Sequence, residues 1–418
     1  MDPFRMRRLL HVLLAATVPA ANGRVLAQDT AARVLRPTTV SAVRFGSVGQ
    51  VRELGDRRVI VNDPARHQVV LLDSTLGKAV VLIDSAAAAG SATHAYGGGR
   101  ATITPYLADS TWFIDRTAMA QVLLDPNGAI ARVSAAPHPA DMSSASGAHD
   151  PKGRSVYQVP ARRAIPPPGA SAQEASQIPM PESAFVVRTI PGSQAAETLA
   201  TVRTARTYPP VLVTNPDGKL TQHEIINPMQ LQDSWVLMSG GTVAILREHD
   251  FHVDFIDPDG GRRASQPVPY RWERWSDSAK AGLTAAFQAF LDSTINRGPG
   301  PGGSRPGTVT LGVPPADDLP DYAQPFIPRQ TWADADDQLW FSPFVAPPSP
   351  SIKNMLVQSM GNTLPDTTTT YFIMNHAGAV VDRVVVLSGF TIVGFGRGVV
   401  YLTSREADGV ALVRARVR

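Results

Sequence analysis

The sequence predicts an all-β fold made of repeated small sheets, and three observations support this prediction. Residues 107–136 have the pattern strand, short connection, strand, Asp-Pro-Asn-Gly turn and strand, and residues 54–86 repeat it. In each copy two aspartates stand 10 residues apart, and both are displaced by the same 52 residues: Asp63 and Asp73 in the first copy, Asp115 and Asp125 in the second. The 418 residues include no cysteine, so no disulfide holds the fold and apolar burial must stabilise it.

We expect residues 1–27 to be an export signal. A basic start with Arg5, Arg7 and Arg8 precedes an apolar run over 9–21, and a small-residue cleavage site ends at Ala27. The apolar run is shorter than the roughly 20 residues that span a bilayer, and no later segment approaches that length without charges or prolines. We therefore expect a chain exported to the periplasm or beyond, cleaved near Ala27, without a membrane span. The alternative is an ordinary amphipathic first helix.

Charge and length exclude several classes of function. Removing the four arginines and one aspartate of residues 1–27 leaves 35 basic and 35 acidic residues. A balanced chain without a basic stripe is not expected to bind nucleic acid or an anionic membrane surface. The remaining length, about 390 residues, exceeds one simple domain, and a closed array of small sheets explains how it remains one unit.

The first two repeats are the clearest. Residues 32–54 are expected to form one strand without a local partner. The expected strands are 59–61, 68–72 and 79–83 in the first repeat, and 112–114, 121–124 and 129–133 in the second. Asp and Gly residues in 73–77 suit the hairpin turn, because Gly tolerates positive φ and Asp hydrogen-bonds its own backbone. We expect residues 86–99 to connect the two repeats.

The next two repeats carry additions. The expected strands are 155–159, 185–190 and 199–204 in the third repeat, and 234–238, 243–246 and 251–256 in the fourth. A Pro-, Ala- and Ser-rich insert, 160–181, buries too little apolar surface to order itself fully. The hairpin predicted over 211–226 is either the outer pair of a sheet or an appended ribbon.

The last third of the chain completes the array. One helix is predicted over 276–295, because Ser276 can cap it and its large apolar residues recur at helical spacing. Two further disorder-prone inserts cover about 298–328 and 343–351. The fifth repeat has its strands at 337–340, 370–374 and 380–387, and the tail supplies at most three strands. The unpartnered N-terminal strand would complete a sixth sheet, so residues 32–418 are predicted to form a six-bladed β-propeller closed by N- and C-terminal strands.

The framework motifs resemble a known group. Residues 59–63 and 68–73, their copies at 112–115 and 121–125, and the Val-Gly-Phe-Gly-Arg-Gly of 393–398 resemble secreted six-bladed propellers of the TolB-like and NHL-like kind. The resemblance covers most of the chain after residue 27. It implies a fold, and because the group includes binding modules, scaffolds and a few enzymes, it does not select a function.

Charged side chains gather in the predicted second-to-third strand connections, which usually lie on the ligand-binding face of a propeller. The candidate binding residues are Asp63, Arg66, His67, Asp115, Arg116, Arg247, Glu248 and His249. If these side chains converge, they form a mixed-charge rim suited to a peptide or an anionic ligand. The alternative is that each Asp or Arg caps its own turn.

No catalytic residue, metal or cofactor is assigned. The densest group of possible metal ligands is residues 247–254, but His249 and His252 would face opposite sides of a strand. Asp254 lies within an apolar strand, where an internal hydrogen bond explains it. No Gly-x-Ser-x-Gly nucleophile motif is present.

These observations favour an exported, non-catalytic binding or scaffolding module for a peptide or protein partner. The alternative is a metal-dependent propeller hydrolase, similar to lactonase-type relatives, or a cyclase, which would require carboxylates or His from several blades to meet around one ion. A structural component of an envelope complex, docked through the helix at 276–295, is a third possibility.

Overall fold

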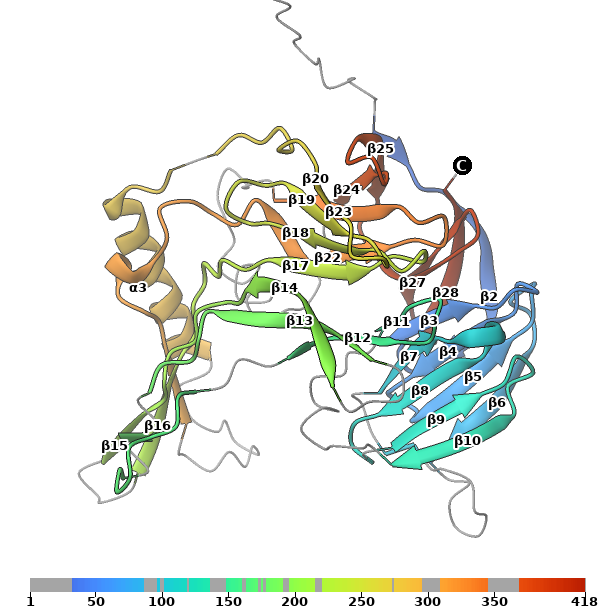
Figure 1. Ribbon diagram of the computed structural model, residues 1–418, viewed down its shortest axis with the longest axis horizontal. Coiled ribbons are helices and arrows are strands. Elements are labelled where there is room, and N and C mark those ends of the chain that lie inside the picture. The colour runs from blue at the N-terminus through green and yellow to red at the C-terminus, as the bar shows by residue number, and fades with distance from the viewer. Residues whose placement is uncertain are drawn as a thin grey trace, which may run out of the picture. The chain divides into compact units, whose positions relative to one another are not determined.

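Consecutive strands pair into antiparallel sheets throughout the part of the chain that the computed structural model describes (Figure 1). The described residues are 32–85, 96–97, 101–118, 120–135, 148–159, 163–171, 174–175, 178–190, 195–214, 220–272, 274–294, 309–344 and 368–417. The predicted export signal lies outside them. Residues Ala32–Arg418 form one compact unit.

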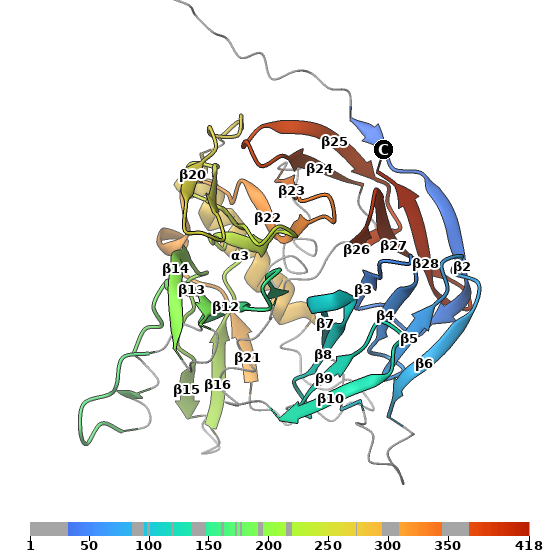
Figure 2. The ribbon, with the colours of Figure 1, turned by 45° about the vertical axis from the view of Figure 1, so that its right-hand side comes forward.

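Three four-stranded sheets form the first half of this unit. The first contains β3 (Gln50–Glu53), β4 (Val59–Asp63), β5 (Gln68–Leu72) and β6 (Ala79–Asp84). The second contains β7 (Thr102–Pro105), β8 (Thr111–Asp115), β9 (Ala120–Leu124) and β10 (Ile130–Ala135), with a short 3-10 turn at Leu107–Asp109. The third contains β11 (Ala148–His149), β12 (Ser155–Val159), β13 (Ser183–Thr189) and β14 (Ala196–Arg203). Figure 2 shows the first and second sheets side by side.

Three further sheets follow. The fourth contains β17 (Ser234–Leu237), β18 (Val243–Leu246), β19 (Val253–Ile256) and β20 (Arg262–Ala264). The fifth contains β22 (Phe326–Ala333), β23 (Leu339–Pro343), β24 (Thr369–Met374) and β25 (Val380–Val386). The sixth contains β26 (Phe390–Gly396), β27 (Val399–Glu406), β28 (Gly409–Arg416) and, from the N-terminal part of the unit, β2 (Pro37–Phe45).

Closure by the two ends of the chain is confirmed. Strand β2 pairs antiparallel with β28, which places an N-terminal strand beside three C-terminal ones. The sequence did not predict that β1 (Arg33–Val34) adds a parallel fifth strand to β25, where Arg33 donates to the Asp382 carboxylate at 2.5 Å. The expected single strand over 32–54 is therefore three strands, because β1, β2 and β3 each enter a different sheet.

Apolar contacts join each sheet to the next in sequence and then return from the sixth to the first. In the part of the chain that the structure describes, five of the six seams contain a shared buried cluster: Leu54, Ile60, Ile103 and Phe113 between sheets one and two; Val156, Val186, Val243 and Ile245 between three and four; Phe251, Phe255, Phe326 and Phe341 between four and five; Trp340, Ile373, Val400 and Val413 between five and six; Val59, Val61, Val393 and Tyr401 between six and one. Between sheets two and three, His149 stacks on Trp112. This succession of small antiparallel sheets is a β-propeller, as predicted.

Two links between sheets build an additional element, which we call the accessory unit. The link from the third to the fourth sheet contains the hairpin β15 (Val211–Thr214) and β16 (Leu220–Ile225). The link from the fourth to the fifth contains α3 (Asp277–Thr294), β21 (Val309–Gly312) and a 3-10 turn at Ala316–Asp318. Strand β21 pairs in parallel with β16, so the hairpin predicted over 211–226 is an appended ribbon.

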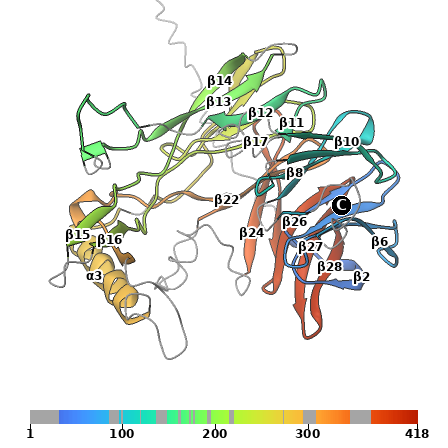
Figure 3. The same cartoon turned by 90° about the horizontal axis from the view of Figure 1, so that it is seen from below.

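The helix has the predicted position and the predicted apolar side. Leu283, Phe287 and Leu291 are buried one turn apart, and the Ser276 hydroxyl accepts a hydrogen bond from the Ala279 N–H at 3.2 Å. Figure 3 shows α3 beside β15 and β16. Among the described residues, no helix is both long enough and apolar enough to span a membrane.

Several strands were not predicted from the sequence. The inner strands β7 and β11 fall in stretches expected to be connections or left unassigned, and β21 falls inside the expected insert 298–328. Residues 298–308 and 345–351 lie outside the described residues. The described residues within 160–181 form no strand, and only Glu174 and Ala175 are helical.

Candidate functional site

The Asp63 carboxylate, predicted as part of a ligand-binding rim, is fully buried at the end of β4. Its Oδ2 accepts a hydrogen bond from the Gly46 N–H at 2.8 Å, and its Oδ1 accepts from the Ser47 and Arg66 N–H groups at 2.9 and 3.2 Å. The side chain therefore caps its own turn and also fastens the link between the sixth and first sheets. The Arg66 guanidinium donates to the Arg44 carbonyl at 2.6 Å.

Asp115 repeats this arrangement in the second sheet. Its buried carboxylate accepts hydrogen bonds from the Thr117 and Ala118 N–H groups at 2.9 and 3.0 Å, and from the Gly97 N–H. Arg116, next to it, is half-buried. The exposed His67 ring stacks on Tyr96 with centroids 5.5 Å apart.

Arg247 occupies the equivalent position in the fourth sheet, and there the charges are reversed. Its guanidinium donates to Asp254 and to Asp233, each at 2.7 Å, and to the Thr201 carbonyl at 2.8 Å. Burial acts to lower the pKa of Arg247, but the hydrogen bonds to Asp254 and Asp233 raise it overall. The guanidinium that stands where the first two sheets have an aspartate is thus itself held by two carboxylates, Asp233 from the segment before β17 and Asp254 from β19.

Glu248 is buried and pairs with Arg203, whereas the side chain of His249 is 78% exposed and lies 3.2 Å from the Asp250 carboxylate. The contacts described here lie within the candidates' own connections or reach neighbouring segments, and the joint role of the eight residues in binding stays a prediction. Between Asp250 and Asp254, His252 approaches one carboxylate with each ring nitrogen, at 2.5 and 3.1 Å. Among the described residues, no group of three or more His, Asp or Glu side chains could hold a metal ion.

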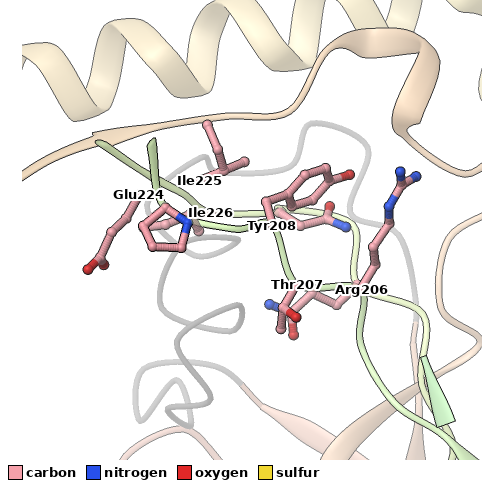
Figure 4. Close-up of a pocket in the computed structure, with 9 residues that line it drawn as sticks. Arg206, Thr207, Tyr208, Glu224, Ile225 and Ile226 are labelled. Carbon is pink, nitrogen blue, oxygen red and sulfur yellow. The ribbon is translucent and has the colours of Figure 1, made fainter. Parts of the chain in front are cut away.

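A pocket of about 330 Å³ lies in the accessory unit, where residues 206–210 leave the third sheet and residues 224–230 return to the fourth (Figure 4). This volume lies at the lower end of the range of small-molecule sites. Its apolar walls are Pro210, Ile225, Ile226 and the ring of Tyr208, and its polar lining is Arg206, Thr207, Glu224, Asn227 and Gln230.

Tyr208 and Arg206 form one side of this pocket. The Arg206 guanidinium lies over the Tyr208 ring, 5.1 Å from its centroid, and 3.6 Å from both Glu182 and Asp318. Burial raises the pKa of Tyr208, so its hydroxyl remains protonated at neutral pH. That hydroxyl is buried and has no hydrogen-bond partner among the described residues.

Ion pairs connect part of the predicted rim to the pocket. Glu248 pairs with Arg203, Arg203 lies 3.8 Å from Glu182, and Glu182 lies 3.6 Å from Arg206. Glu248 is among the residues predicted from the sequence, whereas Arg206 and Tyr208 are not. The available local signal was Tyr208 followed by two prolines in a stretch between strands, which does not by itself indicate a pocket.

No family model and no curated protein sequence matches this chain. Solved structures of low sequence identity align with most of it. Among solved structures, a virginiamycin B lyase from Staphylococcus aureus is 9% identical, with 91% of this chain and 98% of that chain covered and a TM-score of 0.37. A putative exported protein from Bacteroides fragilis is 8% identical over 94% and 97% of the two chains, with a TM-score of 0.44. A gluconolactonase from Xanthomonas campestris is 11% identical over 92% and 96%, with a TM-score of 0.34.

Proposed function

We propose that this chain is an exported binding module for a peptide or protein partner, and that the pocket of the accessory unit contacts the partner. Assignment to the TolB-like and NHL-like propellers is part of the same proposal. The supporting observation is the accessory unit itself, which carries a pocket. Shorter links would be enough to join the sheets on either side of it.

The links that build the accessory unit are much longer than the shortest links between sheets. Three residues, 387–389, join the fifth sheet to the sixth, and four residues, 46–49, join the sixth to the first. The links that build the accessory unit contain 30 residues (204–233) and 61 residues (265–325). Long connections on a rigid framework commonly carry function, since the framework does not require them.

The residues originally predicted to bind are less available than the pocket. Asp63, Asp115 and Glu248 are buried and already accept hydrogen bonds or an ion pair from the chain itself. Recruiting them would break those contacts, and each uncompensated buried group costs on the order of 1–3 kcal/mol. The lining of the pocket, in contrast, includes the exposed side chains of Arg206, Thr207 and Glu224.

The test is selection of a random dodecapeptide library on the immobilised full chain, followed by affinity measurement with synthetic selected peptides. Thr207→Trp places a large ring in the pocket without changing a buried residue. We expect it to weaken binding by at least about 10-fold, or about 1.4 kcal/mol. Thr198→Trp, at an exposed position of β14, is the matched control and should bind as the original chain does.

Three results would contradict the proposal. The first is the absence of any enriched peptide, and the second is equal binding by the Thr207→Trp variant. The third is hydrolysis of a simple lactone by the purified chain with added calcium or zinc, lost on chelation, which would favour the metal-dependent hydrolase instead.

A further inference from the structure

The accessory unit contains a three-stranded sheet, in the order β15, β16 and β21, and its two edges differ. At the β21 edge, the Gln288 side chain of α3 takes the place of a further strand. Its amide N–H donates to the Leu311 carbonyl at 3.4 Å, and its amide oxygen accepts from the Val313 N–H at 3.2 Å. Strand β15 forms the other edge, where the described residues supply no pairing strand (Figure 2).

The backbone at the β15 edge is regular and unpaired on its outer side. All four residues of β15 pair with β16 without a bulge, from Val211 opposite His223 to Thr214 opposite Leu220. In an antiparallel pair, alternate residues direct their N–H and C=O groups away from the partner. Beyond the pairing with β16, no backbone hydrogen bond joins β15 to another described residue. This edge therefore presents donors and acceptors in the geometry that a further strand requires.

The outer edges of the six propeller sheets are protected against such pairing. Strands β2, β6, β10 and β14 each belong to a pairing that is interrupted by a β-bulge. Strand β20 contains Arg262 and Arg263, and β25 is covered by β1. Bulges and charged side chains are common means of preventing edge-to-edge pairing. Strand β15 has the sequence Val-Leu-Val-Thr, with neither a charge nor a bulge, so its edge lacks this protection.

One face of the same sheet is exposed beside this edge. Val211 and Val213 point to one face, because side chains alternate along a strand, and they are 42% and 48% exposed. Val211 pairs with His223, and Ile225, two residues further along β16, lies on that face and forms a wall of the pocket. On the opposite face, Leu311 packs against the buried apolar residues of α3. The helix therefore covers the face that the two valines do not share.

The free edge leads to the pocket. Pro210, which precedes β15, and Tyr208 belong to the pocket wall, so a segment that runs along the edge past Val211 arrives at the pocket. A second copy of this chain would contribute only its own four-residue edge, far short of the roughly 1,200–2,000 Å² that stable interfaces bury. An extended peptide is not limited in this way, because it can pair along β15 and continue into the pocket.

We propose that an extended segment of the partner adds to this sheet as a fourth strand, paired along the free edge of β15. Apolar side chains at every second position of that segment then contact Val211 and Val213. In such complexes the main-chain hydrogen bonds supply affinity and the alternating side chains supply specificity. This inference rests on the proposed function, because it states how the peptide partner is held beside the pocket.

The test is isothermal titration of the full chain with the capped, uncharged peptide acetyl-Ser-Thr-Val-Thr-Val-Thr-Ser-amide. Two derivatives carry N-methyl groups, one on both Val nitrogens and the other on all three Thr nitrogens. Because the N–H groups of successive residues point to opposite edges of a strand, each derivative loses the donors of one edge only. We expect one derivative to bind at least about 10-fold more weakly than the parent peptide, and the other to bind as the parent does.

A pair of variants tests the site on the protein. Val213→Lys places a charge at the β15 edge and should weaken binding of the parent peptide at least about 10-fold. Because the peptide is uncharged, charge repulsion between the two cannot cause this loss. Val133→Lys, on the bulged strand β10, is the matched control, since the two valines are equally exposed, at 48%. This control should bind the peptide as the original chain does.

The outcomes separate the inference from the proposed function. If both N-methylated derivatives bind as the parent does, or if both lose binding, pairing along one edge is wrong. If Thr207→Trp removes binding of the parent peptide and Val213→Lys does not, the pocket is a peptide site and strand addition is wrong. If the parent peptide does not bind, the inference fails, and the library selection decides the proposed function independently. A dimer in sedimentation equilibrium that Val213→Lys abolishes would make a second copy the occupant and would also overturn the inference.

Discussion

The seam between the sixth and first sheets differs sharply from the seam between the second and third. At the first of these seams, 11 buried apolar residues from both sheets form one cluster. The Glu53 carboxylate crosses the seam and accepts hydrogen bonds from the Tyr401 hydroxyl at 2.6 Å and the Arg397 N–H at 3.0 Å. Gly394 and Gly396 allow this approach, because an added Cβ would lie 2.5 Å from the Val51 carbonyl and 2.4 Å from Glu53, respectively.

The seam between the second and third sheets is much less apolar in the described residues. Its buried cluster contains only Trp112 and Ile114, both from the second sheet. From the third sheet, the His149 ring stacks on Trp112 and meets Tyr106 edge-on. The Trp112 indole N–H is buried and has no hydrogen-bond partner among the described residues.

The difference indicates where the closed array opens first. Apolar burial contributes roughly 25 cal/mol per Å², so a seam with few buried apolar side chains is held more weakly than one with many. Local opening follows the regions with the fewest buried apolar contacts. We therefore expect the second and third sheets to separate before the sixth and first. This is so although the sixth sheet is the one that closes the ring by pairing an N-terminal strand with C-terminal strands.

The largest expected effect comes from filling the close approach at the stronger seam. Gly394→Val would place a branched side chain against the Val51 backbone, which cannot move aside as a flexible side chain could. We expect a loss of about 3 kcal/mol or more in the free energy of unfolding, measured by urea denaturation. Gly282→Ala in α3, where no atom lies within 4 Å of the added methyl group, is the control and should stabilise by roughly 0.5–1 kcal/mol. A Gly394→Val chain as stable as the original would show that this seam is loosely packed.

Acid should weaken the seam between the second and third sheets, which contains His149. Burial lowers the pKa of His149 from 6.5 to about 4. Between these values the unfolded chain binds a proton that the folded chain excludes, so stability falls as the pH falls from about 6.5 toward 4. The contribution of this one residue is roughly 2–3 kcal/mol across that window.

His149→Phe retains an aromatic ring against Trp112 and cannot titrate. We expect this variant to lose less stability than the original chain between pH 7 and pH 4.5, measured by urea denaturation at both values. His249→Gln, which changes a side chain that is 78% exposed, serves as the control and should keep the original pH dependence. An unchanged pH dependence in His149→Phe would mean that the second-to-third seam is not the acid-sensitive one.

The framework could be predicted from the sequence because its turns are encoded locally. Asp125 shows this, since its carboxylate accepts hydrogen bonds from the N–H groups of Asn127 and Ala129 within five residues. The inner strands β7 and β11 could not be recognised in the same way. They contain four and two residues, and they are strands only because neighbouring strands supply their hydrogen bonds.

The pocket could not be predicted because it depends on contacts between distant segments. Tyr208 and Ile225 face one pocket only after β15 pairs with β16, and β21, about 85 residues further along the chain, pairs with β16 on its other side. For Asp63 and Asp115, the sequence alone left two interpretations open. The turn-capping alternative describes the local hydrogen bonds of both carboxylates. It does not include their hydrogen bonds from the Gly46 and Gly97 N–H groups, which come from segments 17 and 18 residues earlier in the chain.

The smallest expected changes in stability come from the polar contacts of the two seams. Glu53→Gln keeps the shape and the acceptor oxygen but removes the charge that strengthens the bonds to Tyr401 and Arg397. We expect a loss of about 1 kcal/mol by urea denaturation, because a charge-assisted hydrogen bond contributes more than a neutral one. Thr104→Val at the second-to-third seam removes a hydroxyl that lies 3.5 Å from the His149 Nδ1, at the limit of a hydrogen bond, and should change stability by less than about 0.5 kcal/mol. Equal losses in the two variants would mean that polar contacts hold both seams alike, and the contrast between them would then rest on apolar burial alone.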